Sequence, residues 1–272
     1  MKKKIIDFLD AIVYGRPIPN RDYDQIYMNA SSMLRQIKFI KKFISHRKMV
    51  FLGDGDGMSI LLSALSENGE LEKIDSITVY DFDERILNSI RNQINQLNVI
   101  TTPFTYKLYN VIMPIEKEEQ GKYDFFYINP PYGSKNSGFS CILWIDRCID
   151  LCINQCLGCI IIPYDQYIDW TVNNMIVIQK YLIEKGFIIK EMKEGLHQYH
   201  LDDNPNLTSV ALIVEKRANQ ASTYHDKFIE KELVKNLYGS PRRIPKYIYI
   251  SNEDLSGRKD FSWEYGEDNF WI

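Results

Sequence analysis

The sequence has little that would suggest a membrane protein, a disulfide-rich scaffold or a strongly charged partner. No apolar run in the 272 residues approaches the ~20 residues that cross a bilayer, so we expect no membrane association. The net charge is only −3, which excludes a strongly basic nucleic-acid-binding chain. The cysteines number five, and Asp7 and Asp10 interrupt the apolar stretch behind the basic N-terminus. These features favour a reducing cytoplasm and argue against a signal peptide.

Metal-ligand patterns are also scarce. Cys148, Cys152 and Cys156 recur every four residues, and Cys156 and Cys159 form a C-x-x-C pair. A zinc site usually needs a second ligand pair at a defined distance, which the sequence lacks. Isoleucine and leucine surround these cysteines, and buried thiols are common core residues. We therefore predict no metal site.

A regular alternation of apolar strands and amphipathic helices is present instead. The strands are expected at 49–53, 76–81, 104–110, 123–129, 158–163, 187–195 and 207–216. The helices are expected within the first 20 residues, after a cap at Asn29 or Ser31, and at 58–69, 83–97, about 140–154 and 171–186. Continuous apolar strands that alternate with helices are typical of a parallel sheet covered on both faces.

The last two strands are joined by "LHQYHLDDNPN" without a helix, so we expect them to form an antiparallel hairpin. The resulting α/β pattern of seven mostly parallel strands resembles the Rossmann-like methyltransferase fold. We assign residues 1–28 to an N-terminal helix and linker, 29–216 to the cofactor-binding catalytic domain, and 217–272 to a C-terminal extension. The extension lacks a clear hydrophobic period.

Glycines and polar residues gather at consecutive strand ends. Gly53, Gly55 and Gly57 follow the first strand, with Asp54 and Asp56 between them. Open sheets of this kind bind ligands beyond the carboxyl ends of their strands, where glycine lets the backbone come close to a ligand. The alternative is an ordinary tight turn between strand and helix.

The next two strand ends carry an acid and an amide. Asp81 follows Gly53 by 28 positions and precedes Phe82, a spacing close to that of an acid that binds ribose hydroxyls. Asn110, followed by Val111, is a candidate contact to an adenine edge. The alternatives are a helix cap, which Asp83 would equally supply, and an Asx turn at Asn110. Gln25, in "DYDQIY", is placed either over the bound cofactor or in a plain turn.

This order of glycine, acid and amide resembles S-adenosylmethionine (SAM)-dependent methyltransferases over residues 29–216. The dinucleotide pattern G-x-G-x-x-G would require glycine at position 58, which is Met58, so a dinucleotide is the weaker interpretation.

The fourth strand ends in "NPPYG", where Asn129, Pro130, Pro131 and Tyr132 match the [D/N/S]-P-P-[Y/F/W] motif of enzymes that methylate planar nitrogens. The Asn side-chain carbonyl and a Pro backbone carbonyl can accept hydrogen bonds from the N–H groups of an amine. These bonds would hold the amine lone pair toward the methyl donor. Proline fixes φ and lacks a competing N–H donor. Tyr132 can stack on a base. The alternative is a rigid surface turn.

A second resemblance covers residues 22–216 and concerns the branched-chain polyamine synthases, which use decarboxylated SAM. It is carried by "DYDQIYMNASSMLRQIKFI", "FLGDGDGMSI", "VYDFDERI" and "LIEKGFIIKEMKEGLHQY". That family has G-D-D-D in the glycine loop and D-P-P-Y at the catalytic corner. Gly55 and Asn129 replace two of these acids here, and Asn cannot act as a general base.

The motifs together predict an N-methyltransferase that uses SAM, with N6 of adenine in nucleic acid as the expected acceptor. Aminopropyl transfer from decarboxylated SAM to a polyamine is the enzymatic alternative, and a non-catalytic methyltransferase-like subunit is the third. The C-terminal "SPRRIPKYIYI" mixes basic and aromatic residues, which suits nucleic acid, but an aromatic tail packed on the domain or on a partner subunit fits equally. The sequence leaves a homodimer open.

Overall fold

The computed structural model describes residues 2–98, 100–199, 207–239, 245–250 and 261–265. Seven strands form the main sheet: β1 (Lys48–Leu52), β2 (Ser76–Asp81), β3 (Phe104–Leu108), β4 (Tyr123–Ile128), β5 (Cys152–Pro163), β6 (Phe187–Gln198) and β7 (Thr208–Lys216). The helices are α1 (Lys2–Gly15), α2 (Ala30–Ile40), α3 (Met58–Glu67), α4 (Glu84–Leu97), α5 (Phe139–Leu151), α6 (Asp169–Glu184) and α7 (Lys231–Val234). Short 3-10 turns lie at Arg21–Tyr23, Lys41–Phe43 and Lys117–Glu119.

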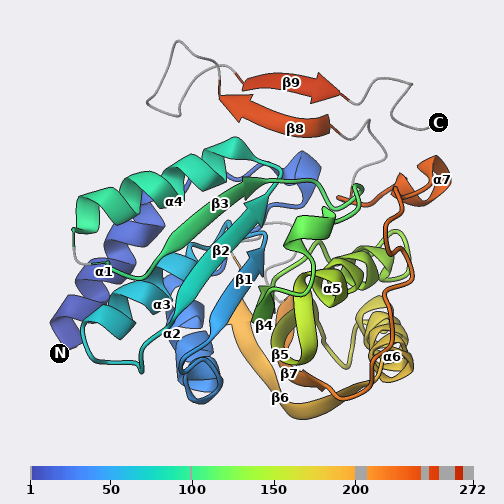
Figure 1. Ribbon diagram of the computed structural model, residues 1–272, viewed down its shortest axis with the longest axis horizontal. Helices are drawn as coiled ribbons and strands as arrows, with labels where there is room; N and C mark the ends of the chain where they lie inside the picture. The colour runs from blue at the N-terminus through green and yellow to red at the C-terminus, as the bar shows by residue number, and fades with distance from the viewer. Residues whose placement is uncertain (1, 99, 200–206, 240–244, 251–260, 266–272) are drawn as a thin grey trace.

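The strand order is β3-β2-β1-β4-β5-β7-β6 (Figure 1). The first five strands of this order run parallel, and β7 pairs antiparallel with both β5 and β6. This arrangement confirms the predicted α/β sheet with an antiparallel C-terminal hairpin.

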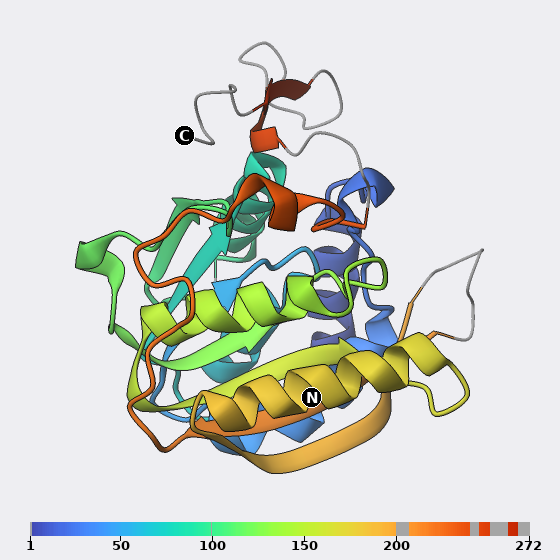
Figure 2. The same cartoon turned by 90° about the vertical axis from the view of Figure 1, so that its right-hand side faces the viewer.

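Both faces of the sheet are buried, as the continuous apolar strands predict. In β1, Met49 and Phe51 face the core beneath α1 to α4, whereas Val50 and Leu52 face the core beneath α5 and α6. Figure 2 shows α5 and α6 stacked on the second face. The predicted cap of α2 is also present, because the Asn29 side chain accepts a hydrogen bond from the Ser32 amide at 2.9 Å.

The predicted end of the fifth helix, about residue 154, is wrong. Helix α5 ends at Leu151, and β5 begins at once with Cys152. The first part of β5 is irregular: Gln155 has a φ of 69°, and the pairing with β4 shifts register between Tyr123 and Phe125. This local irregularity hides the strand start from a periodicity argument.

Residues 222–239, which we call the strap, run back over α5 toward the carboxyl ends of the strands (Figure 2). Buried Arg147 of α5 fixes them by donating hydrogen bonds to the carbonyls of Tyr224 and Lys227, both at 2.8 Å, and to that of Val111 at 2.9 Å. The strap therefore packs on the same core as the sheet.

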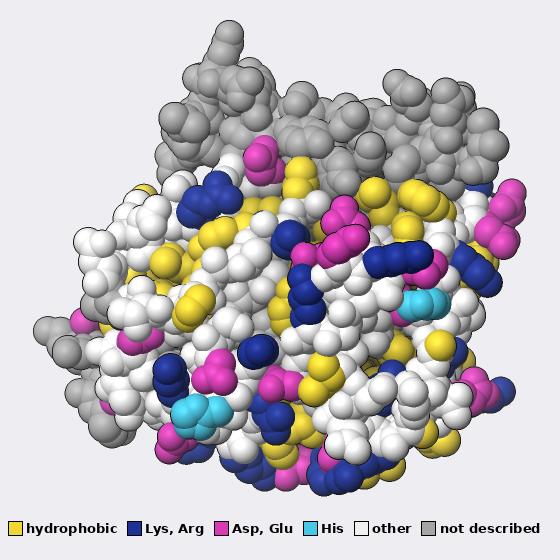
Figure 3. All heavy atoms as spheres, in the orientation of Figure 1, with side chains coloured by type: hydrophobic (Ala, Val, Ile, Leu, Met, Phe, Trp, Pro, Cys, Tyr) yellow, Lys and Arg dark blue, Asp and Glu magenta, His cyan; other side chains and the backbone are white. Residues whose placement is uncertain are grey.

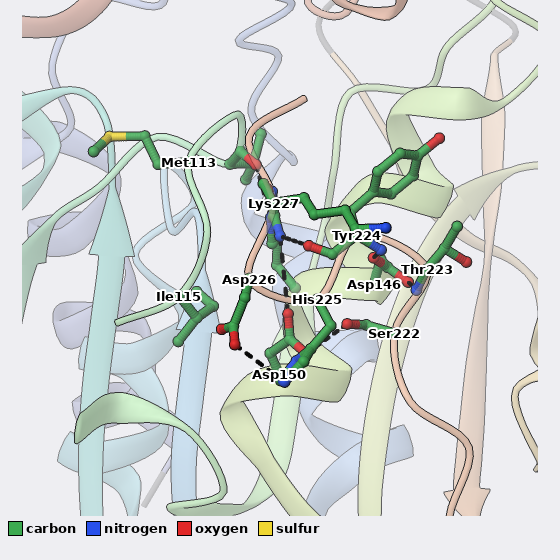
Figure 4. A network of polar contacts seen from close by, with 12 residues as sticks. Met113, Ile115, Asp146, Asp150, Ser222, Thr223, Tyr224, His225, Asp226 and Lys227 are labelled. Carbon is green, nitrogen blue, oxygen red and sulfur yellow. Dashed lines mark hydrogen bonds and ion pairs between the residues drawn. The ribbon is translucent and has the colours of Figure 1, made fainter. Parts of the chain in front are cut away.

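Two carboxylates of α5 hold the start of the strap (Figure 4). Asp146 accepts hydrogen bonds from the backbone amides of Thr223 at 2.7 Å and Tyr224 at 2.8 Å. Asp150 accepts from the Ser222 hydroxyl at 2.5 Å and contacts His225 Nδ1 at 2.8 Å. The contact with Asp150 raises the pKa of His225, although burial opposes it.

A separate antiparallel pair, β8 (Pro245–Ile250) and β9 (Phe261–Tyr265), follows the strap (Figure 1). The side chains of the basic and aromatic segment around it, including Arg242 and Arg243, lie outside the described residues. None of the described helices is long and apolar enough to span a membrane.

Candidate functional site

A cavity with about 720 Å³ of empty space, which includes open solvent, lies at the carboxyl ends of β1, β2 and β4. The glycine loop, the ends of β2 and β3, and the NPPY corner contribute to its wall, together with residues 23–27 from the N-terminal segment and Tyr238 from the strap. The sheet topology thus brings together the strand ends that the sequence analysis selected.

The three glycines of the loop have different roles. Gly53 has a φ of 84° and lines the cavity, and a Cβ built on it would meet no atom within 4 Å. A Cβ on Gly55 would lie 2.5 Å from Tyr27 Cε1, so this glycine lets the Tyr27 ring cover the loop. Gly57 has a φ of 69° and packs against Ile12 rather than lining the cavity.

Two buried carboxylates lie behind the loop. Asp54 caps α3, because its oxygens accept hydrogen bonds from the amides of Met58 at 2.8 Å and Ser59 at 3.1 Å. Asp81 accepts from the amides of Asp83 at 2.9 Å and Asp54 at 3.3 Å. Burial raises the pKa of Asp54 to about 7 and that of Asp81 to about 8, the latter also through the charge of Asp83.

An aromatic wall forms another part of the cavity lining. The ring of Phe82 lies 4.8 Å from that of Tyr238 and 5.7 Å from that of Tyr23, measured between centroids. Trp144 of α5 contacts Tyr238 edge to face at 5.6 Å. Such a wall suits a flat heterocycle or a sulfonium cation.

Asn110 lies behind this wall, whereas its neighbour Val111 lines the cavity. The Asn110 side-chain oxygen accepts hydrogen bonds from the Ile112 amide and the Tyr238 hydroxyl, both at 3.2 Å. Asn110 therefore joins the end of β3 to the strap.

Gln25 lines the cavity from the N-terminal segment. Its amide nitrogen donates to Asp83 at 2.9 Å, and its oxygen accepts from the Asn20 amide at 2.8 Å and from Arg85 at 3.2 Å. Arg85 also pairs with Asp83, so the residues before α2 are tied to the start of α4.

The NPPY corner is held by two aspartates. Asn129 donates from its amide nitrogen to Asp56 at 2.9 Å, and Asp56 also accepts from the Met28 amide at 2.7 Å. The Tyr132 amide donates to Asp24 at 3.3 Å. Burial raises the pKa values of both Asp24 and Asp56.

A second, smaller pocket of about 230 Å³ adjoins the first, and Asp24, Ile26 and Asn129 line both. Pro131 lines the larger cavity, whereas Pro130, Tyr132 and Tyr199 line the smaller one. The corner thus lies between two adjoining pockets that share Asn129 in their walls.

The structure also places residues that the motifs alone did not assign to the site. Tyr23 and Tyr27 precede the first predicted strand, and Tyr199 and Tyr238 lie in stretches without a clear period. Their only signal in the sequence is the density of tyrosine, 18 residues in all. The cysteines at 141, 148, 152, 156 and 159 are buried and free, and no three His, Cys, Asp or Glu side chains within the described ranges could hold a metal ion.

Residues 4–256 match the family model of the branched-chain polyamine synthase A C-terminal domain. The chain belongs to this family. Among the curated proteins, none matches it.

Members of the branched-chain polyamine synthase family are also among the similar solved structures. The enzyme from Thermus thermophilus, in complex with N4-aminopropylspermidine and 5′-methylthioadenosine, is 18% identical with a TM-score of 0.67, over 84% of this chain and 67% of that one. An engineered form of that enzyme gives a TM-score of 0.69 at 17% identity, over 88% of this chain and 70% of that one. A proposed RNA methyltransferase from Pyrococcus horikoshii is 12% identical with a TM-score of 0.56, over 79% of this chain and 99% of that one. These likenesses establish the SAM methyltransferase-like fold that the sequence predicts.

The cavity has features that suit a nucleoside. Gly53 leaves open space where a side chain would otherwise stand, Asp81 offers carboxylate oxygens, and Phe82, Tyr23 and Tyr238 form the aromatic wall. These residues would hold SAM or decarboxylated SAM.

Proposed function

We propose that the protein transfers an aminopropyl group from decarboxylated SAM to an amine nitrogen of a polyamine. The observation that carries this proposal is the charge of the larger cavity, which we call the donor cavity. Four carboxylates line it, from Asp24, Asp54, Asp56 and Asp81, and none of the described lining residues is Lys, Arg or His.

This charge distribution favours decarboxylated SAM over SAM. SAM carries an α-carboxylate, and a carboxylate that is buried beside other carboxylates without a cationic partner is strongly disfavoured. Decarboxylated SAM lacks that group and carries positive charge at the sulfonium and the terminal amine. Both charges would be attracted by the ionised aspartates, and would in turn favour the ionised forms of Asp54 and Asp81, whose pKa values burial raises.

The chain's own residues orient the acceptor amine at the NPPY corner. The Asn129 amide is fixed by its bond to Asp56, so its carbonyl oxygen is left to accept an N–H bond. Asp24 lines both pockets and offers the carboxylate that Asn129 no longer supplies. Because burial raises the pKa of Asp24, this group is suited to take a proton from an ammonium.

When bound, the donor supplies an electrophilic carbon whose bond to sulfur breaks as the amine nitrogen bonds to it, and 5′-methylthioadenosine leaves. The nitrogen that becomes positively charged in this step passes its proton to Asp24 and then to solvent. The Asp24 carboxylate is held at the corner by the hydrogen bond that it accepts from the Tyr132 backbone amide.

The test is to incubate the protein with decarboxylated SAM and spermidine and to follow 5′-methylthioadenosine and the gain of one aminopropyl group by mass spectrometry. Asp24→Asn is the matched variant. Asp24 has a φ of 56°, which Asn tolerates, and an Asn oxygen still accepts from the Tyr132 amide. We expect Asp24→Asn to lower kcat at least tenfold while the affinity for 5′-methylthioadenosine stays within twofold.

One observation favours a second candidate, methyl transfer to a planar amino nitrogen such as N6 of adenine. The fixed Asn129 amide turns a neutral carbonyl toward the acceptor, as an uncharged amine requires. The described part of the face in Figure 3, however, has Lys and Arg interspersed with Asp and Glu, and it offers no extended basic area for a phosphate backbone.

The same assay separates the candidates. Product with SAM and an adenine-containing acceptor, and none with decarboxylated SAM and polyamine, would replace the proposal by methyl transfer. Tight binding of 5′-methylthioadenosine without turnover of either donor would point to a non-catalytic subunit.

A further inference from the structure

A continuous chain of hydrogen bonds runs into the core from the smaller of the two pockets, which we call the acceptor pocket. It contains six side chains, all buried: Tyr132, Tyr199, Ser209, His197, Gln36 and Cys159. They come from the NPPY corner, the β6 and β7 hairpin, α2 and β5. Only its first two members, Tyr132 and Tyr199, line the acceptor pocket.

The groups at the inner end of this hydrogen-bond chain determine which partner donates in each of its bonds. The Gln36 amide nitrogen donates to Cys159 Sγ at 3.1 Å, and burial raises the pKa of Cys159 to about 12, so the sulfur stays a thiol. The Gln36 oxygen therefore faces His197 Nε2 at 2.8 Å and requires a hydrogen on that nitrogen. Burial lowers the pKa of His197 to about 3, so the imidazole is neutral and Nδ1 carries no hydrogen.

The remaining hydrogen bonds, out to the pocket, have the same donor-to-acceptor direction. His197 Nδ1 must accept from the Ser209 hydroxyl, which lies 2.7 Å away. Ser209 then accepts from the Tyr199 hydroxyl at 2.8 Å, and Tyr199 accepts from the Tyr132 hydroxyl. Both tyrosine hydrogens consequently point toward the core.

We propose that these hydrogen bonds make the two tyrosine oxygens of the acceptor pocket hydrogen-bond acceptors, so that the pocket favours a substrate nitrogen that carries N–H groups. The side chains with polar atoms that line the pocket are those of Asp24, Asn129, Tyr132 and Tyr199, and Asn129 donates one amide hydrogen to Asp56. Pro130 adds no N–H. Ser209 and His197 are positioning residues, because they act on the substrate only through Tyr199.

The inference rests on the proposed function only for the identity of the acceptor, and its first test needs no reaction. Nitrogen-15 NMR of the imidazole of His197 reports which ring nitrogen carries the hydrogen. We expect hydrogen on Nε2 and none on Nδ1 in the free protein. Hydrogen on Nδ1 would reverse the chain, turn a tyrosine hydroxyl hydrogen toward the pocket, and overturn the inference.

The second test uses a matched pair of variants at position 197. In His197→Asn, the amide oxygen can replace Nδ1 as the acceptor for Ser209, whereas His197→Leu removes it. We expect Leu to raise the KM or Kd for spermidine about tenfold, as the loss of a buried hydrogen bond implies. We expect Asn to recover most of that loss, and the affinity for 5′-methylthioadenosine to stay within twofold in both variants.

Two controls keep the outcomes separate. Ser209→Ala should resemble His197→Leu, and His46→Asn, an exposed histidine paired with Asp75, should resemble the parent. Equal losses of spermidine and 5′-methylthioadenosine binding would mean that His197 supports only the fold, and would overturn the inference. If the parent binds no spermidine while hydrogen lies on Nε2, the proposed function fails and the directed chain stands.

Discussion

Asn129→Asp should make the protein's stability depend on pH, because it places two carboxylates at the catalytic corner. In the parent, the Asn129 amide nitrogen lies 2.9 Å from an oxygen of Asp56, and burial already raises the pKa of Asp56. The variant replaces this donor by a second acid, so the hydrogen bond survives only while the two carboxylates share one proton.

The size of the effect follows from the distance. Two unit charges about 4 Å apart at an effective dielectric constant of about 20 repel by about 4 kcal/mol. This corresponds to about three pKa units, so the shared proton would leave near pH 7 rather than near the ordinary carboxyl pKa of about 4. Since the pKa is raised in the folded state, the variant should match the parent's stability at acidic pH and lose it as pH rises through about 7.

Urea unfolding followed by tryptophan fluorescence from pH 5 to pH 8 would measure this loss. The matched control is the double variant Asp56→Asn with Asn129→Asp, which restores one amide and one carboxylate with their places exchanged. It should recover most of the stability at pH 8. A destabilisation by Asn129→Asp that is constant across this pH range would contradict a shared proton between the two carboxylates.

Three further predictions concern the cavity and the strap. Gly55→Ala should displace the Tyr27 ring, 2.5 Å from the new Cβ, and weaken 5′-methylthioadenosine binding about tenfold by calorimetry; unchanged affinity would show that the ring does not touch the ligand. Arg147→Met should lower the free energy of unfolding by about 3–5 kcal/mol in urea, since three strap and loop carbonyls lose their donor; a loss below about 1 kcal/mol would contradict this. Because Asp54 and Asp81 have pKa values of about 7 and 8, binding of cationic decarboxylated SAM should release protons near pH 7. Calorimetry in phosphate and Tris buffers should then give different enthalpies, and equal enthalpies would count against the prediction.

The sheet and its strand ends were predictable because their signals are local. The glycine loop, Asp81 and the NPPY corner each follow an apolar strand directly, and the parallel topology then brings them to one edge. The start of β5 was not predictable, since its first residues form an irregular strand whose positive φ at Gln155 breaks the period.

The aromatic and acceptor residues were hidden for a different reason. Tyr199 and Tyr238 reach the site through tertiary contacts, with Ser209 in one case and with Asn110 in the other. No spacing rule connects them to the glycine loop. Asp24 lies in the same "DYDQIY" stretch as Gln25, but its place between the two pockets depends on the fold of the segment before α2.

The wall of the donor cavity is assembled from both ends of the described chain. Tyr23 comes from before the sheet and Tyr238 from after it, and their rings meet at 6.0 Å with no covalent link between those segments. A nucleoside that bound against both rings would hold the two segments together for as long as it stayed bound. Ligand binding should therefore slow amide hydrogen exchange and proteolysis in both segments together, although more than 200 residues of sequence separate them.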